Sequence, residues 1–181
     1  VKRIGDQIGE VYLLHHRMQK KDAWDKSVEM LEKVGIPSPR TRAMEYPHQL
    51  SGGMRQRVVI AMALACSPKL VIADEPTTAL DVTVQAQILA LLDELQKSLR
   101  SSVLLITHDL GVIAETCDEV CVMYAGRIVE RASTQELFAN PRHAYTRGLL
   151  SSIPRLDGVP KTKLVAIEGM AVSYTHLTLP T

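Results

Sequence analysis

Two adjacent carboxylates, Asp74 and Glu75, come directly after a short apolar run at 70–73, and His108 follows a second strand-like run at 103–107. Open α/β sheets bind their ligands beyond the carboxyl ends of the strands. An aspartate at such a strand end can hold Mg²⁺, which prefers hard oxygen ligands, and the next acid can polarise an attacking water. A histidine there can hydrogen-bond the same water or a developing phosphoryl oxygen. This spacing predicts a site suited to phosphoryl transfer.

Each of these residues also has a simpler interpretation. Two acids at a strand end can be ordinary solvated side chains, and a single histidine is more often a structural or surface residue. A phosphoryl-transfer site is therefore predicted from the two strand ends together, because both are expected to place polar groups at the same rim of the sheet.

A serine and two glycines, Ser51, Gly52 and Gly53, precede a further apolar helical segment. Serine is a favoured N-cap residue, and glycine lets backbone N–H groups approach a ligand closely. The start of a helix carries partial positive charge and unpaired N–H donors, which suit a phosphate. The alternative is a capped helix with a flexible lead-in.

The elements that must position these residues follow from the periodicity of apolar side chains. Residues 1–50 predict a helical subdomain without strands, with helices over residues 2–18 and from Asp22, as a cap, to about Val34. Further along, the pattern predicts helices at 51–66, 82–99 and 109–116, and strands at 69–74, 103–107, 119–124 and 127–131. The strand at 69–74 has the composition of a strand buried on both faces. This alternation predicts an α/β fold with a mainly parallel sheet.

Composition narrows the function classes. The chain has 181 residues, with 21 Lys and Arg against 20 Asp and Glu, a net charge of +1 that argues against a nucleic-acid-binding surface. The 46% hydrophobic content excludes a disordered chain, and no apolar run is long enough to cross a membrane. Three cysteines do not make a disulfide scaffold, so we expect cytosolic thiols.

Four motifs occur in a fixed order: LSGGMRQR at 50–57, LVIADEP at 70–76, ALD at 79–81 and TH at 107–108. With them, the chain resembles the nucleotide-binding subunits of ABC transporters, whose core is a P-loop NTPase fold. The resemblance extends from about residue 1 to about residue 170. YPHQL at 46–50, MYAGRIVE at 123–130 and PRHAYTRGLL at 141–150 are most similar to the ATP-binding subunits of dipeptide, oligopeptide and nickel importers.

This resemblance implies a role for each matching residue. Ser51, Gly52 and Gly53 match the signature motif, which contacts the γ-phosphate of ATP bound to a second subunit. Asp81 matches the D-loop at the interface between the two subunits.

The acids and the histidine of the strand ends have family counterparts as well. Asp74 matches the Walker B aspartate that helps to hold Mg²⁺, Glu75 the catalytic glutamate that orients water, and His108 the switch histidine near the γ-phosphate. ATP and Mg²⁺ are the implied cofactors.

The resemblance also implies partners and a location. The implied partners are a second ATPase subunit, either identical or different, the transmembrane permease subunits and, indirectly, a solute-binding protein. Nucleic acid is not an implied partner. The location is the cytoplasmic face of a bacterial or archaeal plasma membrane.

The sequence departs from the family at both ends. The phosphate-binding loop GxxxxGK[ST] is absent, because none of the ten glycines is followed by Lys and then Ser or Thr. We expect the chain to be part of a longer protein that has this loop upstream, and expect residues 1–181 alone to be inactive. Residues 171–181 do not resemble the family and are expected to be a non-native tail.

The expected domain organisation is a partial helical subdomain at 1–50, the ATPase core at 51–152 and the start of an importer-type extension at 153–170. Two alternatives stay open. One is an ABC-type ATPase of DNA repair or chromosome maintenance, although the sequence has no sustained heptads of a coiled coil. The other is a non-catalytic fragment.

Overall fold

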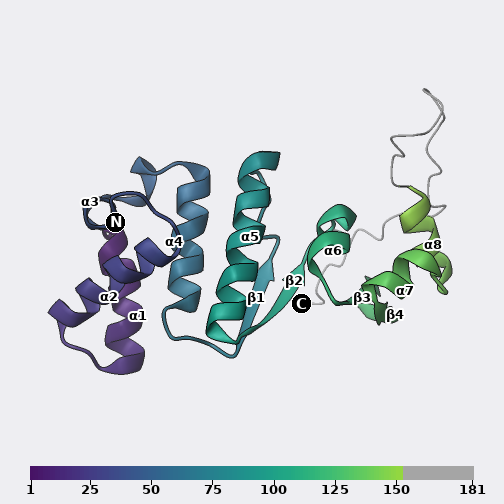
Figure 1. Ribbon diagram of the computed structural model, residues 1–181, viewed down its shortest axis with the longest axis horizontal. Coiled ribbons are helices and arrows are strands. Elements are labelled where there is room, and N and C mark those ends of the chain that lie inside the picture. The colour runs from purple at the N-terminus through teal and green to yellow at the C-terminus, as the bar shows by residue number, and fades with distance from the viewer. Residues whose placement is uncertain (153–181) are drawn as a thin grey trace, which may run out of the picture. The chain divides into compact units, whose positions relative to one another are not determined.

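The computed structural model describes residues 1–152, and the chain divides into two units, residues 1–108 and 109–181 (Figure 1). The predicted extension at 153–170 and the predicted tail at 171–181 lie outside the described residues.

The first unit begins with helices only, as predicted for residues 1–50. They are α1 (Ile4–His16), α2 (Lys20–Lys33), α3 (Pro39–Met44), a 3₁₀ turn (Pro47–Gln49) and then α4 (Gly52–Leu64). One boundary prediction is wrong: α2 begins at Lys20 with Gln19 as its N-cap, so Asp22 does not cap it. Asp22 lies in the first turn instead, where its negative charge complements the positive end of the helix.

Helices α1 and α2 pack closely side by side (Figure 1). Ile4 and Ile8 of α1 and Leu31 of α2 are fully buried in a shared core. The approach is close because Gly5 faces Trp24: a Cβ added at Gly5 would lie 2.5 Å from the indole ring. Gly5 therefore allows the Trp24 ring to lie against the backbone of α1.

A strand–helix–strand unit completes the first unit. β1 (Leu70–Asp74) and β2 (Ser102–Ile106) are parallel, with Leu70 opposite Ser102 and Asp74 opposite Ile106, and α5 (Val82–Leu99) connects them. Val71 of β1 is buried in one core with four residues of α5, Ile88, Leu91, Leu92 and Leu95. The predicted α/β class and the predicted bounds of this long helix are confirmed.

The prediction that β1 is buried on both faces is wrong for this chain. Alternate residues are buried, but Leu70 and Ile72 are 54% and 62% exposed, and their neighbours Leu104 and Ile106 on β2 are 51% and 46% exposed. Side chains alternate between the two faces of a strand, and α5 covers only one face. The four exposed side chains form an apolar surface, called below the open sheet face.

The second unit contains an antiparallel hairpin, in contrast to the parallel pair of the first. Its described elements are α6 (Leu110–Thr116), β3 (Glu119–Tyr124), β4 (Arg127–Ser133), α7 (Thr134–Ala139) and α8 (Ala144–Ser151). Ala125 and Gly126 form the turn with φ of 47° and 77°, the left-handed values that a tight hairpin turn requires. Leu137 of α7 is buried against the hairpin. In residues 1–152, none of the helices is both long enough and apolar enough to span a membrane.

Candidate functional site

The structure brings Glu75 and His108 into contact. They follow neighbouring parallel strands, whose carboxyl ends lie at the same edge of the sheet, and the backbone N–H of Glu75 donates to the carbonyl of Ile106 at 2.8 Å. The Nδ1 atom of His108 lies 2.6 Å from Oε1 of Glu75. An ionised carboxylate only accepts hydrogen bonds, so Nδ1 carries the proton in this pair, and Nε2 is the acceptor nitrogen when the ring is neutral.

The backbone and one hydroxyl also hold Glu75 in place. Its φ is 48°, in the left-handed region that non-glycine residues rarely adopt, and the turn that follows contains a second such residue, Ala79 with φ 62°. Thr78 donates its hydroxyl to Oε2 of Glu75 at 2.5 Å. This hydrogen bond lowers the pKa of Glu75 below its ordinary value, and the hydrogen bond from His108 lowers it further with a smaller effect. The carboxylate is therefore ionised at neutral pH.

Asp74, the predicted magnesium ligand, ends β1 and is exposed. Strand alternation places it on the same face as Leu70 and Ile72. Over the part of the chain that the structure describes, no group of three or more His, Cys, Asp or Glu side chains is placed to hold a metal ion. An exposed aspartate beside Glu75 fits the way Mg²⁺ usually binds, through one or two carboxylates, with substrate phosphates and water as its other ligands.

Ser51 caps helix α4, as the sequence predicts. Its hydroxyl accepts a hydrogen bond from the backbone N–H of Met54 at 3.3 Å. Ser51 and Gly52 are exposed, and Gly53 is partly exposed. The positive end of α4 is therefore open to an anionic group from outside the chain.

Asp81 caps α5 in the same way, accepting from the backbone N–H of Val84 at 2.9 Å. The start of α5 lies against the start of α4: a Cβ added at Gly52 would lie 3.7 Å from Leu80, and one added at Gly53 would lie 2.7 Å from Val84. The structure thus forms two groupings from the predicted site residues. One is Asp74, Glu75 and His108 at the strand ends, and the other is Ser51, Gly52, Gly53 and Asp81 at two adjoining helix starts.

Sequence reasoning missed two residues that support these groupings. Thr78 contacts Glu75, and its position three residues later in a turn was the available signal. Arg57 of α4 donates to the carbonyl of Val34, at the end of α2, at 2.7 Å. No local pattern predicts that contact, because it joins residues 23 positions apart.

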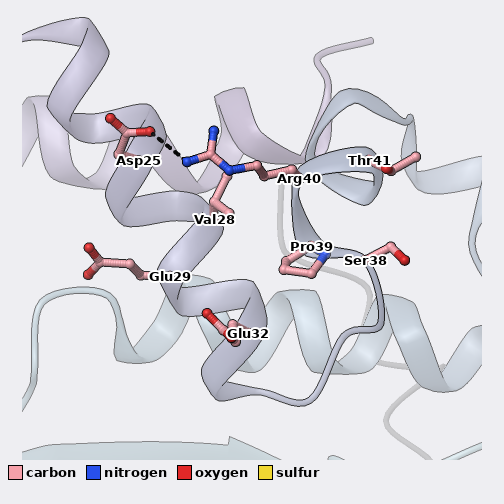
Figure 2. Close-up of a pocket in the computed structure, with 8 residues that line it drawn as sticks. All are labelled: Asp25, Val28, Glu29, Glu32, Ser38, Pro39, Arg40 and Thr41. Atoms are coloured by element: carbon pink, nitrogen blue, oxygen red, sulfur yellow. Dashed lines mark ion pairs between the residues drawn. The ribbon is translucent and has the colours of Figure 1, made fainter.

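A groove lies elsewhere in the first unit, between α2 and the start of α3. Its volume is about 610 Å³. Figure 2 shows its eight lining residues, Asp25, Val28, Glu29, Glu32, Ser38, Pro39, Arg40 and Thr41. Arg40 forms a 3.7 Å ion pair with Asp25, and none of the predicted site residues lines this groove.

Two family models match the chain. One, described as "ABC transporter", matches residues 4–78, and the other, described as "Oligopeptide/dipeptide transporter, C-terminal region", matches residues 129–178.

Similar proteins agree with these matches. The oligopeptide transport ATP-binding protein OppD of Bacillus subtilis is 55% identical over 96% of this chain and 49% of its own length, and the dipeptide transport ATP-binding protein DppD of the same organism is 56% identical over 92% and 49%. The chain spans about half the length of these curated relatives. The solved structure of cbiO1 from Clostridium perfringens, part of the ABC transporter complex cbiONQ, matches 76% of this chain and 53% of its own with a TM-score of 0.65 and 30% identity.

The family matches and the similar proteins agree with the resemblance that the sequence motifs indicate. The positions of the predicted residues, at the strand ends and at the capped starts of α4 and α5, are compatible with it. The chain matches an ABC transporter family model at residues 4–78 and an oligopeptide/dipeptide transporter C-terminal region at 129–178, and it is similar to about half of the length of peptide-transport ATP-binding proteins.

Proposed function

We propose that this chain is part of the subunit that binds and hydrolyses ATP in an importer of oligopeptides or dipeptides. The 2.6 Å contact between Glu75 and His108 carries the enzymatic part of the proposal, because it joins an ionised carboxylate to a proton donor at a strand-end rim. The transport part is supported by relatives whose names describe oligopeptide and dipeptide transport. The same matches favour an importer over an ATPase of DNA repair.

Glu75 is the residue that acts on water. Its carboxylate keeps acceptor capacity beyond the two bonds from Thr78 and His108, and can take a hydrogen bond from an attacking water and then its proton. His108 fixes the carboxylate from one side. Asp74 is the residue that would hold Mg²⁺, which supplies positive charge against the phosphate oxygens when it is bound.

One part of the catalytic unit comes from outside residues 1–181. The sequence contains no phosphate-binding loop, so we propose that another segment of the protein holds the β- and γ-phosphates. Ser51, Gly52 and Gly53 then serve the nucleotide of a second ATPase subunit. The exposure of Ser51 and Gly52 at the positive end of α4 supports this assignment.

The open sheet face supports a further layer in the complete protein. Parallel sheets occur almost only with both faces covered, and Leu70, Ile72, Leu104 and Ile106 leave one apolar face bare. We propose that elements outside residues 1–108 cover it.

The partners follow from the same proposal. A second ATPase subunit meets the helix starts at Ser51 and Asp81, residues 1–50 contact the transmembrane permease subunits, and a solute-binding protein delivers the peptide. The subunit would lie at the cytoplasmic face of the membrane, held there by the permease.

The decisive test is ATP hydrolysis by the full-length protein, assembled with its permease, carrying Glu75→Gln. Glutamine keeps the shape but is a poor base, so we expect kcat to fall by about 10²- to 10⁴-fold. Nucleotide binding should persist, because Glu75 is not a phosphate ligand in this proposal. Glu94→Gln, at an exposed position on α5, is the matched control and should behave as wild type. Wild-type turnover in Glu75→Gln would exclude the assignment.

A second measurement concerns the chain itself. Residues 1–181 expressed alone should show neither ATP hydrolysis nor tight nucleotide binding, because the loop that cradles the phosphates is missing. Equilibrium binding of ATP at micromolar affinity would contradict this expectation.

A further inference from the structure

We propose that Thr78 is a positioning residue for ATP hydrolysis: its hydroxyl fixes the carboxylate of Glu75 in the orientation that receives the attacking water. The inference rests on the function proposed above and adds a residue that the sequence motifs did not single out.

The carboxylate of Glu75 is held by one donor on each oxygen. Thr78 Oγ1 donates to Oε2 at 2.5 Å, and His108 Nδ1 lies 2.6 Å from Oε1. Rotation of the carboxylate about its last side-chain bond would break both hydrogen bonds at once. The two contacts together therefore set the plane of the group, which one contact alone does not do.

Thr78 is held in turn by the backbone. Its N–H donates to the carbonyl of Glu75 at 3.2 Å, which closes a turn that starts at the left-handed Glu75. The hydroxyl and the carboxylate are thus on the same short turn, so their contact does not depend on a distant element. His108, by contrast, reaches Glu75 from the other strand end, 33 residues later in the chain.

The arrangement orients Glu75 without saturating it. A carboxylate has about four lone-pair sites, and the two hydrogen bonds use one on each oxygen. Acceptor sites therefore remain for a water.

The Glu75 side chain has enough freedom for this restraint to matter. It is 39% exposed, and the ring of His108 is 81% exposed. Long, exposed side chains sample several rotamers, and holding one of them has an entropic cost. Without the hydroxyl, the carboxylate would populate orientations in which its lone pairs do not face the water.

The test is steady-state ATP hydrolysis by the full-length assembled protein with three variants. Thr78→Val removes the hydroxyl at nearly constant volume, Thr78→Ser restores a hydroxyl, and Thr77→Val makes the same chemical change at the neighbouring position. We expect Thr78→Val to lower kcat by about 10- to 100-fold, the range expected when a catalytic group is misplaced, with KM for ATP unchanged. Thr78→Ser should recover most of the lost rate, and Thr77→Val should equal wild type.

Two results would overturn the inference. One is wild-type kcat in Thr78→Val, and the other is a loss in Thr78→Val that Thr78→Ser fails to recover, since that loss would come from packing and not from the hydroxyl. Glu75→Gln in the same preparation separates the two proposals. If Glu75→Gln abolishes turnover while Thr78→Val does not affect it, only the role of Thr78 fails; if Glu75→Gln retains turnover, the proposed function fails.

Discussion

The two glycines at the start of α4 offer a way to separate packing from nucleotide contact. Neither has a left-handed φ, so alanine is compatible with the backbone at both positions. Their surroundings differ. A Cβ at Gly52 would meet Leu80 at 3.7 Å, an ordinary contact, whereas a Cβ at Gly53 would lie 2.7 Å from Cγ1 of Val84. Packing against Val84 thus explains why residue 53 is glycine. Packing within the chain does not explain why residue 52 is glycine.

The size of each effect follows from these distances. Overpacking costs about 1–3 kcal/mol, and replacing glycine by alanine in a helix gains at most about 1 kcal/mol. Val84 cannot turn aside easily, because it is β-branched and its N–H is bound by Asp81. We therefore expect Gly53→Ala to destabilise the junction of α4 and α5 by up to about 2 kcal/mol. Gly52→Ala should be neutral or slightly stabilising.

Hydrogen exchange measures the packing effect and ATP hydrolysis measures the functional one. In the full-length protein, Gly53→Ala should raise exchange at the start of α5 by up to about 30-fold, and adding Val84→Ala should reverse most of the increase. Gly52→Ala should leave exchange unchanged. If Gly52 faces the phosphate of a second subunit, Gly52→Ala should still lower ATP turnover, by about 100-fold, because the added methyl group displaces the approaching phosphate.

The packing effect at Gly53 and the nucleotide contact at Gly52 can be refuted separately. Wild-type exchange in Gly53→Ala would show that the Val84 contact does not constrain the site. Full ATP turnover in Gly52→Ala, with unchanged exchange, would remove the case for nucleotide contact at the signature segment Ser51–Gly53.

Three further predictions concern contacts within the two units. Arg57→Ala removes the donor to the Val34 carbonyl, and we expect the last turn of α2 to lose about 1.5–3 kcal/mol of protection against hydrogen exchange; unchanged protection would contradict the link between α4 and α2. Gly5→Ala should destabilise the packing of α1 and α2 by about 1–3 kcal/mol and should be rescued by Trp24→Leu; a failed rescue would place the strain elsewhere. Glu130→Ala removes the acceptor of two backbone N–H groups just before α8, so the hydrogen exchange of these two amides should be faster than in wild type. Exchange rates equal to those of wild type would refute this role of Glu130.

Much of the site could be predicted from local sequence. Ser51 caps the helix that follows it, as expected, and α5 has the predicted bounds. These features depend on hydrogen bonds between residues two to four positions apart, which short sequence patterns specify directly. The resemblance to a family could be recognised for the same reason, because each of its motifs is a short local segment.

Tertiary structure decided the contacts and the layers. The hydrogen bond from His108 to Glu75 depends on the parallel register of β1 and β2, which the residues at 74–75 and 107–108 do not themselves encode. The apolar composition of β1 predicted two buried faces, but composition does not tell whether this chain supplies both covering layers. Within residues 1–108 one layer is present, helix α5, because side-chain alternation gives each strand two faces and a single crossover helix covers one of them.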